Sequence, residues 1–393
     1  MKLFCFRGVK FHIFLLTFGI VLLISSYLWL KYKLCKHFEE QWPDLELFLP
    51  LEPSTEGISE FQTLLLPSLA IFWPKRHNKL VIVTDEEKLR DFTFVYNSLI
   101  DYSNLFQTFR IVGNEPLNFM NGTGWHRQQW LCMWADNYTK AQYVGFVDTD
   151  TVFVTRVLVS DIFKDGKPIV RAHYGKPRPD SWWDRAPEAT FHAIGKKEPF
   201  KCMTYFPVVI KVKHLPLMRE HIRKSLRNRD YFDQTFRMLM QGRYYSQFNL
   251  MCAYLWYHHR DEYHWLIDEL EPSWSGKVIG QVETPEEAGI TEFLPLGPHL
   301  AVHWTYENFG DKKDALRRVL ISGICFAAIG RMWNVPYFCK DFQTNNVLNS
   351  YEWVFEGNNF SDRPGSMQAH QHRMLLMDKE VCPFEPNWDF IPV

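Results

Sequence analysis

A nine-residue run, Gly145 to Phe153 (GFVDTDTVF), constrains the fold of this chain more than any other part of its sequence. Residues 143–147 are aromatic, β-branched or glycine, which is typical of a buried strand, and Asp148 and Asp150 come directly after it. Residues i and i+2 of extended backbone point to the same side, so both carboxylates can address one point beyond the strand, where open α/β sheets bind ligands. Two carboxylates so close together repel each other unless a cation or a shared proton lies between them. A hard divalent ion, which prefers oxygen ligands, would remove this repulsion. The run therefore predicts a site for a metal ion and a diphosphate.

Asp-x-Asp triplets are common in proteins, and most of them are solvated turns. The setting of this one argues against that reading, because an apolar strand runs straight into Asp148 and apolar character resumes at Val152. An Asp left buried and unpaired costs on the order of several kcal/mol, so a partner for these acids is expected.

Composition favours a globular chain and excludes one class of function. Hydrophobic residues make up 46% of the 393 residues and aromatic residues 16%, which is ample material for a core. The net charge of −1 lacks the basic footprint that nucleic-acid binding requires. We therefore expect no nucleic-acid partner.

The amino-terminal region predicts membrane attachment. Residues 11–30 carry no formal charge apart from a histidine, and their number is that needed to cross a bilayer as a helix. Aromatic residues lead directly into lysines at the end of this stretch, which favours an uncleaved signal anchor over a cleaved signal peptide. The expected organisation is a cytoplasmic tail (1–10), a transmembrane signal anchor (11–30), a proline-punctuated stem (31–78), a catalytic domain (79–356) and a tail (357–393).

The location that follows is a Golgi or ER membrane, in a single-pass type II arrangement with the catalytic domain in the lumen. Sequons at Asn121, Asn137 and Asn359 are compatible with it.

The eight cysteines include no Cys-x-x-Cys pair, which argues against a zinc site. Cys132, Cys252 and Cys325 lie within apolar runs and are expected to be core thiols. Cys339 and Cys382 are candidates for a lumenal disulfide, although the sequence alone does not choose among the pairings.

The order of elements from residue 79 onward predicts an α/β fold with a mostly parallel central sheet in a single large domain. Apolar runs predict strands at 80–83 and 109–112 ahead of the 143–147 strand, with helices at 86–98 and 125–137 between them. Later strands are expected at 168–172, 205–210 and 300–304, and later helices at 214–229, 250–257 and 313–333.

Two further stretches carry candidate ligand-binding residues. The helix after Gly124 begins behind glycines, which favours an anion at its amino terminus, and Arg127 is expected to hold a phosphate or to pair with one of the acids, with Gln128 beside it. Residues 175–200 lack a clear period and are expected to form a lid or binding loop, in which aromatic rings stack on a sugar and carboxylates bind its hydroxyls, with ordinary loop packing as the alternative. The candidates in this loop are Asp180, Trp182, Trp183, Asp184 and Glu188.

Three features together resemble the GT-A class of nucleotide-sugar glycosyltransferases: the βαβ start at Leu80, the Phe-Val-Asp-Thr-Asp run at 146–150, and the late strand with His303. More narrowly, the segments at 127–130 (RQQW), 145–150 (GFVDTD) and 246–249 (SQFN) look like a poorly characterised family of Asp-x-Asp transferase-like domains. The resemblance covers roughly residues 79–333.

The resemblance implies a Mn²⁺ or Mg²⁺ ion bound by Asp150, and directly or through water by Asp148, that bridges the phosphates of a UDP- or GDP-linked sugar donor and stabilises the leaving diphosphate. His303 matches the position of a third metal ligand, and Asp148 is alternatively expected to hold the ribose. Thr84 and Asp85 are expected near the nucleotide base, while Gln247 and Asn249 are substrate-binding candidates. The acceptor is a glycan, protein or lipid.

The base that takes the acceptor proton is the gap in this assignment. Gln247 cannot serve, so Asp180, Asp184, Glu188 and Asp233 are the candidates, and a retaining mechanism or an inactive homologue stays open.

Two other functions compete with the transferase. Residues 148–152 (DTDTV) also fit the motif of haloacid-dehalogenase-type phosphatases, with Asp148 as nucleophile and Asp150 as acid/base. That motif usually ends the first strand of its domain, whereas two strands are predicted ahead of it here. A membrane-tethered binding protein that keeps the fold without turnover is the third reading.

Overall fold

The computed structural model describes residues 42–303, except for 53, 75–76, 86–105, 115–123, 154–156, 176–185, 203–204, 227–231, 241–244, 270–278, 295 and 297–300, together with 22, 23, 25–27 and 29 near the amino terminus. The last group is helical and belongs to a different compact unit from the described residues that begin at Pro43. Among the residues described, no helix has the length and apolar character to cross a bilayer. The predicted anchor at 11–30 lies mostly outside the described residues, as do the predicted helices at 86–98 and 313–333 and the tail at 357–393.

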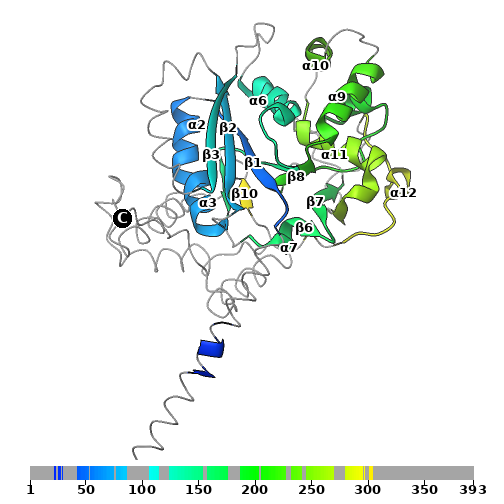
Figure 1. Ribbon diagram of the computed structural model, residues 1–393. Coiled ribbons are helices and arrows are strands. Elements are labelled where there is room, and N and C mark those ends of the chain that lie inside the picture. Colours follow the sequence, from blue (N-terminus) through cyan, green and yellow to red (C-terminus); the bar gives the residue numbers. More distant parts are fainter. Residues whose placement is uncertain are drawn as a thin grey trace, which may run out of the picture. The chain divides into compact units, whose positions relative to one another are not determined.

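The centre of the fold is a five-stranded, mostly parallel sheet in the order β3-β2-β1-β4-β8 (Figure 1). Its strands are β1 (Leu45–Pro50), β2 (Lys79–Asp85), β3 (Thr108–Asn114), β4 (Tyr143–Phe146) and β8 (Val208–Lys211). The first four run parallel, and β8 pairs antiparallel with β4. The predicted α/β class with a mostly parallel sheet is confirmed.

The segment that the sequence interpretation assigned to a stem contains the middle strand of this sheet. Leu47 of β1 lies opposite Leu80 of β2 on one side and Gly145 of β4 on the other, and all six β1 residues are buried. Glu46 is tolerated there because both of its carboxylate oxygens lie 2.8 Å from Nη2 of Arg110. The predicted stem boundary at 78 is therefore wrong for residues 45–72, which belong to the folded domain.

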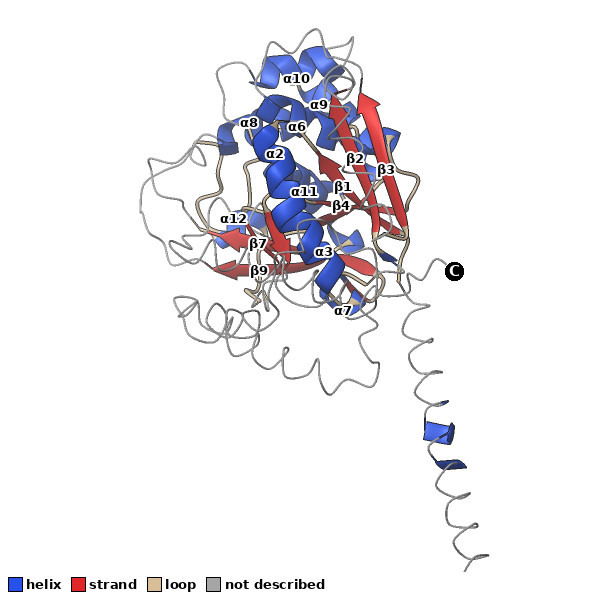
Figure 2. Cartoon of the chain, turned by 90° about the vertical axis from the view of Figure 1, so that its left-hand side faces the viewer, coloured by secondary structure: helices blue, strands red, loops and turns tan. Residues whose placement is uncertain are grey.

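A continuous helical run follows β1 and covers one face of the sheet (Figures 1 and 2). It comprises α2 (Thr55–Glu60), the π-helical turn η1 (Phe61–Leu65) and α3 (Leu66–Phe72). Ser54 caps its start by accepting a hydrogen bond from the N–H of Gly57. Residues 55–72, which were assigned to the stem, are therefore helical throughout.

Two smaller sheets complete the β structure. One has the order β6-β7-β9, made of β6 (Phe163–Lys164), β7 (Lys167–Tyr174) and β9 (His264–Glu269). The other pairs β5 (Thr151–Phe153) antiparallel with β10 (Ala301–His303), so a late part of the chain returns to the residues that directly follow the two acids.

Several of the remaining helices, among them α6 (Gly124–Met133), α8 (Ala186–Ile194) and α9 (His214–Ser225), pack against α11 (Gln247–His258), which is buried over residues 247–256. Such a helix, apolar on all sides, belongs in a core. Its Phe248 ring lies 5.8 Å from that of Phe146 in β4, which fixes the start of α11 near the end of that strand. The other described helices are η4 (Ala135–Asn137), α7 (Val159–Ile162), α10 (Phe232–Met240), η6 (Arg260–Glu262) and α12 (Pro285–Ala288).

Two expectations are corrected by this part of the fold. Residues 186–194, predicted as part of an irregular loop, form α8. Cys252, expected to be a core thiol, forms a disulfide with Cys202 that ties α11 to the chain ahead of β8. Cys132 is a free, buried thiol, as predicted.

Candidate functional site

The order of the strands places a ligand-binding position between β1 and β4. From β1 the chain moves outward through β2 to β3, and then returns to add β4 on the opposite side of β1. In open α/β sheets, ligands bind beyond the carboxyl ends of the strands at this point of reversal. The chain leaves β1 toward Glu52 and leaves β4 toward Asp148, so these two residues flank the expected position.

The two acids predicted to bind metal lie on one tight turn, residues 148–151, which we call the Asp turn. The N–H of Thr151 donates to the carbonyl of Asp148 at 3.0 Å, and the N–H of Asp148 donates to Oγ1 of Thr151 at 3.0 Å. Asp148 is 8% exposed and Asp150 5%. Thr149, between them, donates through its hydroxyl to Oε2 of Glu60 at 3.0 Å. The turn is thus closed internally and fastened to α2.

Helix α6 connects the Asp turn to the end of β2. Nε2 of Gln128 donates to Oδ1 of Asp148 at 2.6 Å. The neighbouring Arg127 forms a two-point ion pair with Asp85, in which Nη2 and Oδ1 are 2.8 Å apart and Nη1 contacts Oδ2. Four of the predicted site residues are thus joined through one helix, and Arg127 pairs with Asp85 rather than with the acids of the Asp turn.

Two buried polar atoms beside this ion pair have no hydrogen-bond partner among the described residues, namely Oγ1 of Thr84 and Nε of Arg127. Thr84 is 2% exposed and directly precedes Asp85 at the end of β2. Buried polar groups in folded proteins are nearly always satisfied by protein, water or ligand.

Gln247, the first residue of α11, contacts Cys132 on α6. Burial raises the pKa of the Cys132 thiol well above its usual value, the charge of Asp148 raises it further, and a hydrogen bond with the Gln247 side chain opposes both. Gln247 therefore lies beside Cys132, whose thiol is in turn close enough to Asp148 to be affected by its charge.

Asn249 has a different position. Its Oδ1 accepts from the N–H of Cys202 at 2.9 Å, and its Nδ2 lies 3.5 Å from Oε1 of Glu198. Its own N–H donates to Oγ of Ser246, the residue that caps α11. These contacts make Asn249 part of the packing around the disulfide, and the structure does not join it to the Asp turn.

The described candidate bases have partners elsewhere. Glu188 on α8 is partly exposed and lies 3.7 Å from Nε2 of His192. Asp233 on α10 accepts a hydrogen bond from Nε1 of Trp130 at 2.8 Å. Trp130 is two residues beyond Gln128, and helical residues at that spacing do not share a face, so Asp233 approaches α6 from another side than the Asp turn does. Asp180, Trp182, Trp183 and Asp184 lie outside the described residues.

The pairing of β10 with β5 places the backbone of His303 next to the Asp turn. In the β5–β10 pair it lies directly opposite Thr151, the residue after Asp150. A position far along the chain thereby returns to the backbone next to the predicted metal site.

Three residues of this region were missed by the sequence interpretation. Glu52 and Glu60 lie in the supposed stem, and Cys132 was expected only to be a core residue. The Glu52 carboxylate lies close against Gly124, at the start of α6, where a larger residue's Cβ would clash with it. The sequence feature that could have revealed Glu52 is the mostly apolar run just ahead of it, LELFLPL (45–51). The prolines at 50 and 53 made this run look like part of a stem rather than a strand.

A search of the curated proteins found no match for this chain. A comparison with protein families found one whose description is "Family of unknown function (DUF6492)", which matches residues 45–272. The match covers more than half of the chain, begins at the first residue of β1, and includes α6, the Asp turn and α11. The chain therefore belongs to the DUF6492 family.

Proposed function

We propose that this protein is a metal-dependent glycosyltransferase of the GT-A type that moves a sugar from a nucleotide-sugar donor to a glycan, protein or lipid acceptor. One observation carries the proposal. The Asp turn lies beyond β4 at the reversal point of a mostly parallel sheet, and α6 joins it through Gln128 to Asp148 and through Arg127 to the end of β2. The turn and the end of β2 lie on either side of the end of β1, at positions of the kind that hold the diphosphate and the nucleoside of one ligand.

The residues of the Asp turn fit a hard divalent cation. Asp148 and Asp150 offer carboxylate oxygens from one closed turn, and the pairing of β10 with β5 brings His303 alongside. Oxygen-rich sets of this kind suit Mn²⁺ or Mg²⁺. When bound there, such an ion supplies Lewis-acid stabilisation of the diphosphate leaving group.

The residues of the chain itself have separate tasks in this proposal. Gln128 fixes the orientation of the Asp148 carboxylate, and Arg127 holds Asp85 at the end of β2. Thr84 and the Nε of Arg127 are buried polar groups near that end of the sheet, where a nucleoside offers hydroxyl and ring acceptors and donors. The donor is expected to be UDP- or GDP-linked.

A secretory-pathway location, Golgi or ER, is part of the proposal. The disulfide between Cys202 and Cys252 supports it, because disulfides persist in oxidising compartments and are rare in the cytosol. The apolar stretch at 11–30 supplies the expected anchor.

The two rival functions make different use of the same residues. In the phosphatase reading, the Asp-x-Asp motif ends the first strand of the domain, but three parallel strands precede Asp148 here. The binding protein without turnover is favoured by the positions of Glu188 and Asp233, each of which has a partner away from the Asp turn.

The proposal is tested with full-length protein in detergent, using thermal stabilisation and hydrolysis of a panel of nucleotide sugars with Mn²⁺. Stabilisation by UDP or GDP and release of the sugar are expected for the wild type and for Asp165→Asn, a matched control in an exposed turn whose φ of 52° suits asparagine. Both are expected to be lost in Asp148→Asn and in Asp150→Asn.

Three outcomes contradict the proposal. Phosphate release from p-nitrophenyl phosphate without nucleotide binding favours the phosphatase. The binding-protein function is favoured if the protein binds nucleotide but neither transfers nor hydrolyses the sugar, and if the Asp148 and Asp150 variants behave as the wild type does. The absence of any nucleotide binding rejects the site itself.

A further inference from the structure

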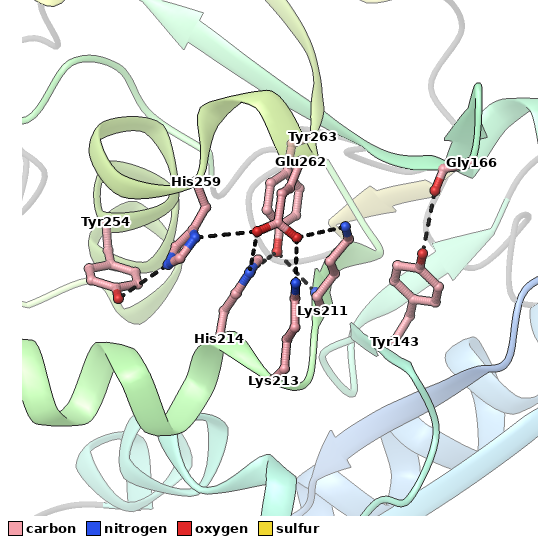
Figure 3. Close-up of polar contacts among 9 residues, drawn as sticks. All are labelled: Tyr143, Gly166, Lys211, Lys213, His214, Tyr254, His259, Glu262 and Tyr263. Atoms are coloured by element: carbon pink, nitrogen blue, oxygen red, sulfur yellow. Dashed lines mark hydrogen bonds and ion pairs between the residues drawn. The ribbon is translucent and has the colours of Figure 1, made fainter.

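A second group of metal-ligating side chains lies at the opposite end of α11 from the Asp turn (Figure 3). His214 begins α9, His259 ends α11, and Glu262 belongs to η6 between α11 and β9. One nitrogen of each ring and one oxygen of the carboxylate all lie within 4.8 Å of one another. Three separate pieces of the fold thus direct one ligand atom each to the same place.

The separations within this group suit ligands around a cation. Oε1 of Glu262 is 3.3 Å from Nε2 of His214 and 3.5 Å from Nδ1 of His259. With metal–ligand bonds of about 2.1 Å, two ligands of a tetrahedral zinc ion are about 3.4 Å apart. Hydrogen bonds between an imidazole and a carboxylate are normally shorter, about 2.7–2.9 Å when charge-assisted. The group is therefore more open than a plain hydrogen-bonded cluster.

Each ligand is held by an outer partner, as is usual at metal sites. The other ring nitrogen of His214 lies 2.7 Å from the hydroxyl of Tyr263, and that of His259 lies 3.4 Å from the hydroxyl of Tyr254. On each ring, the nitrogen that does not contact a tyrosine is the one that faces Oε1 of Glu262.

The second oxygen of the Glu262 carboxylate also has hydrogen-bond partners. Oε2 of Glu262 accepts from Lys211 at 2.9 Å and from Lys213 at 2.6 Å, while Oε1 faces the two histidines (Figure 3). Ligating carboxylates are commonly hydrogen-bonded through their second oxygen in this way. The lysines also add positive charge near the site, and the Lys213 side chain is 61% exposed, so solvent screens much of its effect.

The group is buried on one side and open to solvent on the other. The His214 side chain is 1% exposed, but that of His259 is 19% exposed and that of Glu262 is 32% exposed, so an ion can arrive from solvent.

We propose that His214, His259 and Glu262 bind a zinc ion, with a water molecule in the fourth position. Two imidazoles and one carboxylate are a ligand set that zinc accepts, and imidazole favours zinc over the magnesium or manganese expected at the Asp turn. The two rings are stacked, with centroids 4.0 Å apart and planes at 16°. Binding of one ion by both nitrogens therefore requires that one ring rotate out of this stack, because the lone pair of each ligating nitrogen lies in the plane of its ring. The ion ties the start of α9 to the junction between α11 and β9.

This site is independent of the proposed transferase activity. Gln247 and His259 are twelve residues apart on α11, which is about 18 Å along the helix. A single ion cannot serve both ends. Failure of either proposal therefore leaves the other intact.

The proposal is tested by titrating ZnCl₂ into chelator-treated full-length protein in detergent. The titration uses an Asp148→Asn/Asp150→Asn background, which removes the Asp turn as a competing site. One ion per chain is expected, and Co²⁺ in its place is expected to give the visible absorption of a four-coordinate complex. Loss of an outer partner in Tyr263→Phe is expected to weaken binding by about 10–100-fold, and loss of a ligand in His259→Gln or Glu262→Gln by more.

One further variant gives the experiment its control. His258→Gln changes the exposed neighbour of His259, whose ring lies against that of His221, and is expected to bind zinc as the parent does. Each variant is checked by thermal melting in the presence of chelator, so that unfolding is not mistaken for lost binding. Absence of zinc binding at micromolar concentration, or equal affinity in His259→Gln and His258→Gln, overturns the proposal.

Discussion

An amide contacts one carboxylate on the Asp turn directly. Gln128 donates to Oδ1 of Asp148 at 2.6 Å, whereas the two hydrogen bonds that close the turn involve the backbone of Asp148. We expect Gln128→Leu to weaken Mn²⁺ binding by about 10–100-fold, the usual cost of losing an outer-shell partner, while the melting temperature changes little. Titration of Mn²⁺ followed by electron paramagnetic resonance measures the affinity.

The control for this substitution is Gln142→Leu, which makes the same change at an exposed residue just before β4. Equal Mn²⁺ affinity in both variants would show that the hydrogen bond has no part in metal binding.

The ion pair between Arg127 and Asp85 is expected to contribute to stability as well as to the site. Their side chains are 22% and 11% exposed. Removing one partner of a largely buried pair leaves an uncompensated charge and costs about 3–5 kcal/mol. Because Arg127 keeps some solvent contact, we expect Arg127→Met to cost about 3 kcal/mol, which lowers the melting temperature by about 6–12 °C.

A double-mutant cycle separates this effect from lost packing. Adding Asp85→Leu to Arg127→Met is expected to recover most of the loss, because no charge then remains buried. Lys79→Met, which breaks an exposed pair with Asp44, is expected to change stability by less than about 1 kcal/mol. A double variant that is less stable than Arg127→Met would contradict the explanation.

At the scale of elements, β1 is the piece on which the sheet depends. It pairs with β2 on one side and β4 on the other, so its removal leaves two separate pairs of strands and exposes the edges of both. We expect a chain that begins at residue 79 to be insoluble. A chain that begins at residue 43 is expected to yield folded protein, measured by soluble expression and a cooperative thermal transition. Folded protein from the shorter chain would show that β1 is dispensable.

Two of the strands that were predicted correctly, β2 and β4, have a property that β1 lacks. β2 and β4 are uninterrupted apolar runs that end in polar residues, a local signal that survives without tertiary context. In β1 the charge of Glu46 breaks the run, and only its long-range pair with Arg110 makes it acceptable in a central strand. Such a pair, sixty-four residues away, leaves no local mark in the sequence.

Helix α8 was missed for a related reason. Its segment lacks a clear hydrophobic period, and Pro187 does not prevent a helix there, because it is the second residue of α8, where its missing N–H leaves no intrahelical bond unmade.

The candidate site was predictable in its parts but not in its connections. Asp148, Asp150 and the residues of α6 stand out because acids and an arginine follow apolar or glycine-rich stretches. The sequence does not show which residue contacts which. Gln128 contacts Asp148 and Arg127 contacts Asp85 because of the way α6 crosses the ends of β2 and β4, and no local feature of the sequence specifies that crossing. The group of His214, His259 and Glu262 has no motif at all, since its members come together only when α9 and α11 pack.

At the scale of the whole domain, α11 is the element that both proposed metal sites share. Its first residue, Gln247, contacts Cys132, whose thiol is affected by the charge of Asp148, and His259 follows its last turn. The helix is buried along most of its length and is fastened in the middle by the disulfide from Cys252 to Cys202. A helix held in this way is expected to be a rigid spacer and to transmit little between its ends.

Rigidity of α11 predicts that the two sites act independently. Effects of changes more than about 7–10 Å apart, with no shared partner, add to within about 0.3–0.5 kcal/mol, and these ends are about 18 Å apart. Asp150→Ala is therefore expected to leave the zinc affinity within about twofold of the wild type, and His259→Gln is expected to do the same for Mn²⁺ affinity. The losses of melting temperature in the two single variants are expected to sum in the double variant. A coupling above about 1 kcal/mol would instead mean that α11 has two arrangements and that each ion biases the choice between them, because only such a two-state element links sites with no common ligand.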